Sequence, residues 1–370
     1  MTRVPVNDLA AAHSDLADEL EAAVRRVLRS GSYIRGPEVE RFEHDFARYC
    51  GVAGAVGVAS GLDALMLTLE GLGIGAGDEV LVSAHTSIAT WLAITHAGAR
   101  PVPVEPDPRT MLIDPARVES AIGPRTAAII AVHLYGTPAD MDALAAIAER
   151  HRLRVIEDAS QAHGARLRGR PVGSLSVAGA FSLYPTKNLG AIGDAGIVVS
   201  GDPELLDRIR MLSNYGERER HRSELRGRNS RLDELQAALL SVKLEKLEAG
   251  NARRRSRAEQ YLRELSGCPG VEVPRVPEYA LGVWHQFVVR VAERDRVREV
   301  LARRGIDTLV HYPVPPHRSP AYASDYPDPL PITEELAGSV LSLPISPQLS
   351  EEACARVCEE LLATVAAVAA

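Results

Sequence analysis

Residues suited to amine chemistry are rare in this chain. It has 370 residues and 42 basic side chains, of which only Lys187, Lys243 and Lys246 are lysines. Arginine cannot replace a lysine that must form a Schiff base, because the guanidinium group stays protonated. Lys243 and Lys246 fall in an amphipathic helical pattern, where we expect ordinary solvated positions. Lys187 lies in a turn between two apolar runs, which is where a reactive lysine would be held.

Other polar residues follow expected strands and should meet Lys187 at one sheet edge, because ligands of open α/β sheets bind at the carboxyl ends of the strands. Ser60, Gly61 and Leu62 open a helix whose free N–H groups would face an anion. Asp158 and Gln161 follow a later strand, and Ser182 precedes the lysine turn. Taken singly, a plain strand–helix connection explains Ser60 and Gly61, and a helix N-cap explains Asp158.

One cofactor, pyridoxal 5'-phosphate, accounts for these features together. It needs an amine for a Schiff base, an acid that keeps the pyridine nitrogen protonated, and donors for its phosphate. Lys187 would give the amine, Asp158 the acid, and Gln161 a hydrogen bond to the ring's 3-oxygen. Ser182 and the helix start at Gly61 and Leu62 would hold the phosphate. Once freed, Lys187 would serve as the general base.

Two further segments are candidates for substrate binding. The segment 215–231 holds six arginines, which are Arg218, Arg220, Arg222, Arg226, Arg228 and Arg231. They form either a solvated loop or an arm that binds a diphosphate through bidentate contacts. A loop with His311, Tyr312, Pro313 and His317 is either a substrate wall or simply a packed loop.

The elements that must position these residues alternate between β-rich and helical runs, which predicts a mostly parallel sheet covered on both faces. The expected strands are Ala55–Ala59, Glu79–Val82, Arg100–Val104, Ala127–Val132, Arg154–Glu157, Ala180–Leu183, Gly196–Ser200 and Trp284–Val291. The expected helices are Leu62–Leu72, Ile88–Ala97, Asp140–Arg150, one long helix Leu232–Leu265, Arg294–Arg304 and Glu351–Val368. We place a domain boundary near residue 248, which gives a large domain 1–248 and a small domain 249–370.

Composition limits the function classes. The formal charge of −7 argues against a general nucleic-acid binder. The four cysteines form no CxxC pair and have no clustered histidines, so we expect neither disulfides nor a metal site. The first residues contain no apolar signal core, and no run approaches membrane-spanning length. We therefore expect a soluble protein of the reducing cytoplasm.

The motifs resemble the DegT/StrS family of nucleotide-sugar aminotransferases, which depend on pyridoxal phosphate. They extend over nearly the whole chain: Gly31-Ser-Tyr-Ile-Arg-Gly-Pro37 with Phe42-Glu43, Ser60-Gly-Leu-Asp-Ala-Leu65, His85-Thr-Ser-Ile-Ala-Thr-Trp91, Val132-His-Leu-Tyr-Gly136, Glu157-Asp-Ala-Ser-Gln161, Ser182 to Gly190, Gly227-Arg-Asn-Ser-Arg-Leu-Asp-Glu-Leu-Gln-Ala237, His311-Tyr-Pro313 and Ser342-Leu-Pro-Ile345.

The resemblance implies an α/β fold-type I transferase with a large sheet domain and a smaller C-terminal α/β domain. It implies the Schiff-base role for Lys187, ring contacts for Asp158 and Gln161, and a phosphate contact for Ser182. Asn229 matches an asparagine that reaches the phosphate from a neighbouring subunit, which implies a homodimer with shared active sites. The pattern is most similar to enzymes that aminate C-3 of a dTDP-linked 3-keto-6-deoxyhexose with L-glutamate as donor, in macrolide-type deoxyaminosugar pathways.

Two positions depart from the family pattern. Ser87 replaces an aromatic residue that stacks on the cofactor ring, so stacking falls to His85 or another side chain, or the ring is held less tightly. Leu62 replaces a threonine, which leaves only backbone N–H groups of that residue for the phosphate.

Rival functions remain at this point. C-4 amination of a dTDP-4-keto-6-deoxyhexose needs the same residues. A sugar dehydratase of this fold has a histidine in place of Lys187, and a non-catalytic regulator would not need the intact set of Asp158, Gln161 and Lys187. A nicotinamide-dependent dehydrogenase is excluded because no G-x-G-x-x-G turn follows the first strand.

Overall fold

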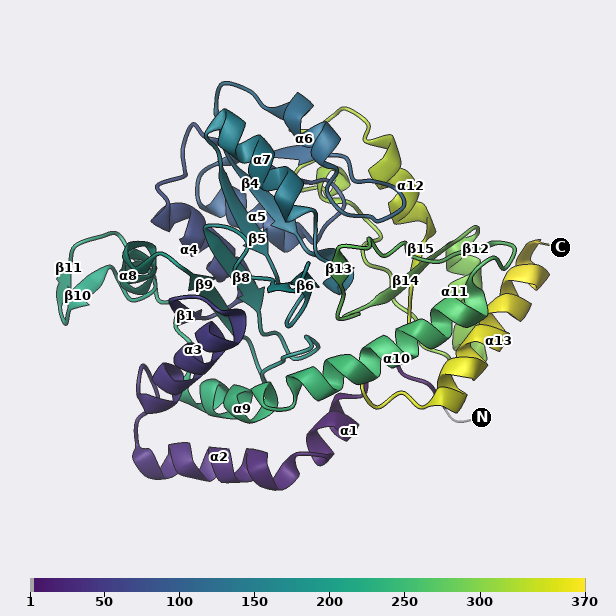
Figure 1. The fold of residues 1–370 in the computed structure, drawn as a ribbon, viewed down its shortest axis with the longest axis horizontal. Coiled ribbons are helices and arrows are strands. Elements are labelled where there is room, and N and C mark those ends of the chain that lie inside the picture. The colour runs from purple at the N-terminus through teal and green to yellow at the C-terminus, as the bar shows by residue number, and fades with distance from the viewer. Residues whose placement is uncertain (1–2, 370) are drawn as a thin grey trace.

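A seven-stranded sheet forms the centre of the computed structural model, which describes residues 3–369 (Figure 1). Its strands, in the order in which they lie side by side, are β1 (Gly54–Val58), β9 (Gly196–Ser200), β8 (Ala178–Ser182), β5 (Arg154–Asp158), β4 (Thr126–Val132), β2 (Glu79–Ser83) and β3 (Arg100–Val104). Strand β9 runs antiparallel to both of its neighbours, and the other pairs are parallel. The prediction of a mostly parallel sheet is thus confirmed.

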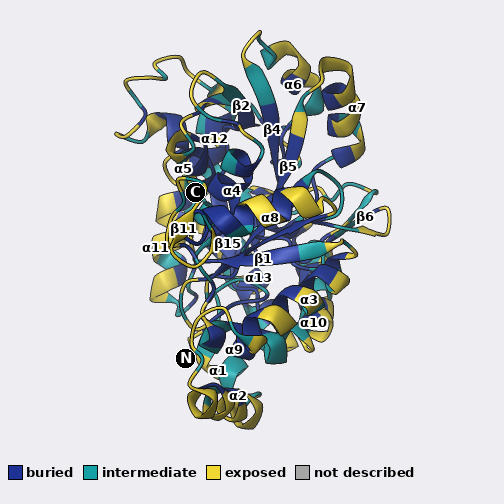
Figure 2. Ribbon diagram, turned by 90° about the vertical axis from the view of Figure 1, so that its left-hand side faces the viewer, coloured by how far each residue is buried: buried dark blue, intermediate teal, exposed yellow. Residues whose placement is uncertain are grey.

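Helices cover both faces of this sheet (Figure 2). One face packs against α4 (Gly61–Gly71), α5 (Ile88–His96) and α8 (Pro203–Leu212). The other face packs against α3 (Pro37–Cys50), α9 (Glu234–Leu244), α6 (Pro115–Ala121) and α7 (Met141–His151). Helix α2 (Ala17–Ser30) lies outside α9, preceded by the short α1 (Leu9–Ser14).

The C-terminal part has its own apolar core around a three-stranded antiparallel sheet. This sheet has the order β12 (Val271–Glu272), β14 (Phe287–Val291) and β15 (Val340–Leu343). The helices α10 (Leu247–Leu265), α11 (Arg294–Arg303) and α13 (Glu351–Ala369) pack on it, and α12 (Pro331–Ser339) lies beside β14. Val4 joins the same core and bridges to Ile306, so the N-terminal segment packs on the C-terminal part of the chain.

Short elements complete the fold. The hairpin β10 (Glu217–Glu219) and β11 (Arg222–Ser223) projects from the body of the molecule (Figure 1). The strands β13 (Ala280–Leu281), β6 (Arg166–Leu167) and β7 (Arg170–Pro171) form a small separate sheet. The 3₁₀ turns are η1 (Leu134–Gly136) and η2 (Pro316–Arg318).

Two sequence-based expectations about these elements need correction. The helix expected over Leu232–Leu265 is two helices, α9 and α10, separated by Glu245 and Lys246. The strand expected from Trp284 begins only at Phe287, because Trp284 adopts a left-handed backbone conformation with a φ of 49°. Met1, Thr2 and Ala370, at the ends of the two predicted domain ranges, lie outside the described residues.

Candidate active site

A pocket of about 320 Å³ lies at the carboxyl ends of the parallel strands. It brings together most of the residues that the sequence singled out, which are Ser60, Gly61, Leu62, Ser87, Asp158, Gln161, Ser182, Lys187 and Tyr312. The other lining residues are both apolar, among them Leu65, Val132 and Leu134, and polar, among them Thr90 and Asp194. The pocket therefore combines the amine of Lys187, the carboxylates of Asp158 and Asp194, and several hydrogen-bonding groups.

Lys187 lies in the turn that links β8 to the segment leading into β9. Its backbone N–H donates to the carbonyl of Tyr184 at 2.9 Å, and the N–H of Ala191 donates to Leu183 at 2.8 Å, which closes the turn. Burial lowers the pKa of Lys187 to about 8, and the negative charge of Asp158 opposes this shift. A substantial fraction of this amine is therefore neutral and nucleophilic near pH 8.

Asp158 ends strand β5 and is 5% exposed. One carboxylate oxygen accepts the Thr90 hydroxyl at 2.8 Å and the other accepts the N–H of Ser160 at 3.2 Å. No helix begins at Asp158, so the N-cap alternative is wrong. The sequence did not single out Thr90, which lies 68 positions from Asp158 and comes close only through the packing of α5.

Gln161 is oriented by two contacts. Its Oε1 accepts the N–H of Tyr135 at 2.6 Å, so its Nε2 donates to the Tyr312 hydroxyl at 3.0 Å on the pocket side. Burial raises the pKa of Tyr312 to about 12, although hydrogen bonds with Ser87 and Gln161 lower it. Both groups thus present hydrogen-bond donors to the pocket at neutral pH.

The opposite end of the pocket is formed by the start of α4 and by Ser182. The Ser60 side chain caps α4 by accepting the N–H of Asp63 at 3.1 Å. A Cβ added at Gly61 would lie 2.5 Å from the Cβ of Ser182, so only glycine permits this approach. First-turn N–H groups have no partner inside their helix, and the helix dipole favours a negative charge beside them. This end therefore suits a phosphate.

The expected ring-stacking role of His85 is not supported. His85 does not line the pocket; it is 1% exposed and its Nε2 lies 2.8 Å from the Tyr135 hydroxyl. The Ser87 side chain accepts the N–H of Ala89 at 3.3 Å and thereby caps the N-terminus of α5. A flat ring in this pocket would instead meet apolar walls.

Two buried histidines, His163 and His285, and the partly buried His311 lie near the lysine turn. Burial, and then the charge of Lys187, lowers the pKa of His163 to about 3 and that of His311 to about 4. The same two causes lower the pKa of His285 well below its usual value. His311 lines a neighbouring cavity, where its Nδ1 lies 2.8 Å from the Ser342 hydroxyl. These imidazoles are neutral at physiological pH and leave the lysine without a competing positive charge.

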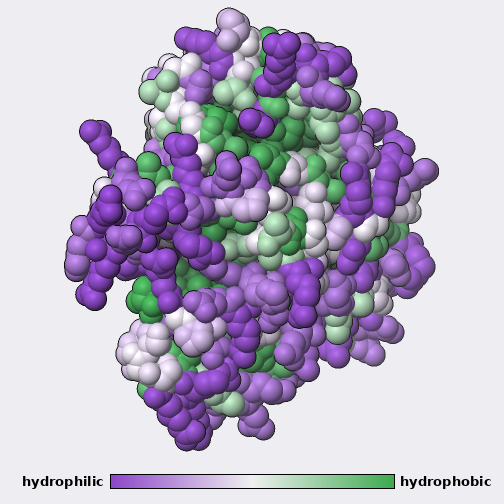
Figure 3. Space-filling view, turned by 60° about the vertical axis from the view of Figure 1, so that its left-hand side comes forward, coloured by the Kyte–Doolittle hydropathy of each residue, from purple (hydrophilic) through white to green (hydrophobic). Residues whose placement is uncertain are grey.

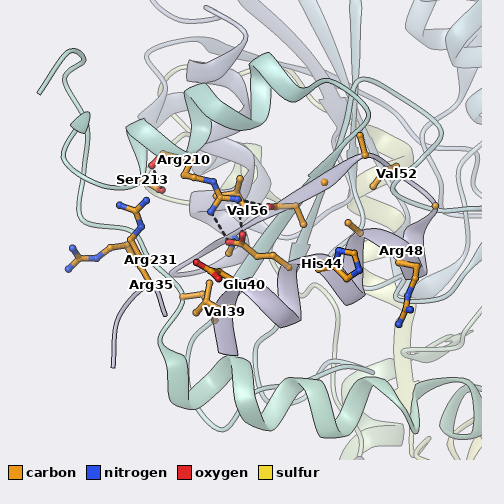
Figure 4. Close-up of a pocket in the computed structure, with 18 residues that line it drawn as sticks. Arg35, Val39, Glu40, His44, Arg48, Val52, Val56, Arg210, Ser213 and Arg231 are labelled. Atoms are coloured by element: carbon orange, nitrogen blue, oxygen red, sulfur yellow. Dashed lines mark hydrogen bonds and ion pairs between the residues drawn. The ribbon is translucent and has the colours of Figure 1, made fainter. Parts of the chain in front are cut away.

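Asn229, Arg228 and Arg231 do not line the pocket of their own chain. They follow the projecting hairpin; Asn229 bridges to Asn214, and Arg228 pairs with Glu70. Arg231 lines a separate cavity of about 750 Å³ beside β1, which Figure 4 shows between Arg35 and Arg48.

Figure 3 shows one face of the molecule, on which hydrophobic residues line a hollow surrounded by hydrophilic ones.

The cavity in Figure 4 contains an ion pair that covers the free edge of the large sheet. Arg210 contacts the carboxylate of Glu43 at 2.7 Å and donates to the carbonyl of Ala55 at 2.9 Å. Glu43 in turn accepts the N–H of Gly57 at 2.7 Å. The pair satisfies backbone groups of β1 that a further strand would otherwise bond, so we assign it a structural role.

The described residues 3–369 contain no helix long and apolar enough to cross a membrane. Within the same range, no three or more His, Cys, Asp or Glu side chains form a group that could hold a metal ion.

Comparison with known proteins identifies a family model that matches residues 14–362, that of the DegT/DnrJ/EryC1/StrS aminotransferase family. The chain is 55% identical to dTDP-3-amino-3,4,6-trideoxy-alpha-D-glucose transaminase of Streptomyces venezuelae, over 96% of this chain and 94% of the relative. It is 54% identical to the erythromycin biosynthesis sensory transduction protein EryC1 of Saccharopolyspora erythraea, over 97% and 99% of the two chains. Among solved structures, that of DesV from S. venezuelae in complex with a ketimine intermediate superimposes with a TM-score of 0.97 at 54% identity, covering 98% of each chain.

Proposed function

Because the chain belongs to the DegT/DnrJ/EryC1/StrS aminotransferase family, we propose that it transfers an amino group to C-3 of a dTDP-linked 3-keto-6-deoxyhexose in deoxyaminosugar biosynthesis. The observation that supports this most strongly is the single pocket that holds Lys187, Asp158, Gln161 and Ser182. The amino donor that we propose is L-glutamate.

The residues of the pocket fit pyridoxal phosphate. Lys187 would bind its aldehyde carbon, Asp158 its ring nitrogen, Gln161 its 3-oxygen, and Ser182 with the N–H groups of Gly61 and Leu62 its phosphate. When bound, this cofactor supplies an electron sink that makes the α-proton of an amino acid removable.

The protein's own residues then prepare the proton transfers. Lys187, with a pKa lowered to about 8 by burial, is suited to take a proton at one carbon and return it at the other. Thr90 holds the Asp158 carboxylate in place, and Tyr135 holds the amide of Gln161.

We place the keto-sugar beside His311 and Tyr312 and propose that Arg228, Arg231 and Asn229 act in the site of a second subunit. Three observations support a homodimer with shared sites. Asn229 is exposed and lies outside its own pocket, and the hairpin before it projects from the body. Large apolar side chains are also exposed on this chain, among them Tyr33, Tyr184 and Tyr215.

We further propose a cytoplasmic location. All four cysteines in the described structure are free thiols, as expected for a reducing compartment.

Product analysis tests the carbon that is aminated. The purified holoenzyme would be incubated with L-glutamate and either a dTDP-3-keto-6-deoxyhexose or a dTDP-4-keto-6-deoxyhexose, and the products examined by mass spectrometry and NMR. We expect an amine at C-3 from the first substrate. Amination of only the 4-keto substrate would replace this proposal with the C-4 alternative.

A regulatory role is the second candidate, because one close relative is named a sensory transduction protein. A regulator would bind the cofactor or the sugar nucleotide without turnover. The same incubation distinguishes the two, since absence of any aminated product from an otherwise cofactor-loaded protein would favour the regulator.

A further inference from the structure

Lys243 does not occupy the solvated position that its helical pattern predicted. It lies on α9, and its Nζ donates to the carbonyl of Gly190 at 2.7 Å and contacts Nε2 of His13 at 3.0 Å. Burial lowers the pKa of Lys243 to about 8, and burial together with Lys243 lowers that of His13. The neutral imidazole of His13 accepts from the ammonium group, which thus joins α1 and α9 to the Gly190 carbonyl.

Gly190 ends the turn that carries Lys187. The N–H of the next residue, Ala191, donates to the carbonyl of Leu183, and this hydrogen bond closes the turn directly after Gly190. A Cβ added at Gly190 would lie 2.3 Å from the carbonyl oxygen of Pro185, which shows how closely the two ends of the turn pack. A displacement of Gly190 would therefore be transmitted through Pro185 to Lys187.

Other contacts fix the same turn from different directions. The Asn188 side chain donates to Asn251 at 2.9 Å and to the carbonyl of Val283 at 3.0 Å. Asn7 donates to the carbonyl of Thr186 at 3.4 Å. Lys243 provides the charged side-chain contact at the Gly190 end, and a charged donor makes a stronger hydrogen bond than a neutral one.

We propose that Lys243 is a positioning residue for the proposed aminotransferase reaction, and that its hydrogen bond to the Gly190 carbonyl sets the place of Lys187 in the pocket. The inference rests on the proposed function of Lys187. It also accounts for a lysine at position 243 in a chain that otherwise prefers arginine, because a compact ammonium group fits two acceptors from different elements better than a planar guanidinium does.

The test compares three variants. Lys243→Met keeps the length of the side chain but removes the donor, whereas Lys243→Gln keeps an N–H donor without the charge. Lys246→Met is the matched control, because Lys246 is exposed on the same segment and makes no side-chain hydrogen bond among the described residues. Each holoenzyme is titrated with base while its visible cofactor band is recorded, and kcat and KM are measured.

For Lys243→Met we expect the midpoint of the band's pH titration to move by roughly half a pH unit or more. We also expect kcat to fall about tenfold while KM for the sugar changes little, because small misplacements of a reacting group are costly. We expect Lys243→Gln, which keeps a weaker neutral donor, to lose at most a few-fold in kcat, and Lys246→Met to match the wild type.

A Lys243→Met protein with the wild-type titration midpoint and kcat would overturn the positioning role. If Lys243→Met does not fold, a folded Lys243→Gln protein with a tenfold lower kcat would overturn the role assigned to the hydrogen bond. A wild-type protein without band or turnover would instead contradict the proposed function itself.

Discussion

The residues around Lys187 set the protonation state of its amine. Burial lowers its pKa, the carboxylate of Asp158 partly offsets this effect, and the nearby histidines stay neutral. Part of this arrangement could be predicted from sequence, because lysine is so rare that position 187 stands out. The supporting contacts of Thr90, Tyr135 and Lys243 could not, because each depends on helices and turns that are far apart in the sequence.

The pH dependence of cofactor uptake tests the lowered pKa of Lys187. Only the neutral amine attacks an aldehyde, so the rate constant for uptake of pyridoxal phosphate by the cofactor-free protein should rise nearly tenfold per pH unit below about pH 8 and level off above it. Absorbance after rapid mixing provides the measurement. A rate that continues to rise up to pH 10 would indicate an ordinary lysine.

At the scale of elements, the strands of the large sheet were predicted well because they are short apolar runs between turn residues. For example, Arg100–Val104 and Gly196–Ser200 match β3 and β9 in full. The break between α9 and α10 was not predictable, because Glu245 and Lys246 are good helix formers and the amphipathic pattern continues through them.

The approach of α4 to β8 depends on Gly61. We expect Gly61→Ala to cost about 1–3 kcal/mol of unfolding free energy, because the new methyl group would overlap Ser182, and to weaken cofactor binding. Gly201→Ala is the control, since a Cβ there has open space. Denaturant unfolding and cofactor titration would check both effects, and equal stability of the two variants would show that α4 can move away from Ser182.

At the scale of the whole molecule, we propose that two copies of the chain build each active site and that the small domain begins near residue 248. Sequence alone pointed to a second subunit through Asn229, and its exposed position outside the pocket is consistent with that role. Limited proteolysis would test the boundary; first cleavage far from residue 248 would argue against it.

Mixed dimers test the shared site. Lys187→Ala and Asn229→Ala subunits would be unfolded, mixed in equal amounts and refolded together. If Asn229 acts in the partner's site, half of the dimers are mixed and each holds one intact site, so about a quarter of wild-type activity should return. Activity no higher than that of the separate variants would show that both residues serve the same chain's site.

The measurement that tests the central claim most directly is the visible absorbance spectrum of the cofactor-loaded protein before and after addition of L-glutamate, with Lys187→Ala alongside. We predict a yellow band in the wild type that bleaches with glutamate, and loss of this behaviour in the variant. A wild-type protein that stays colourless with pyridoxal phosphate, or a variant that bleaches as the wild type does, would contradict the assignment of Lys187 as the reacting amine.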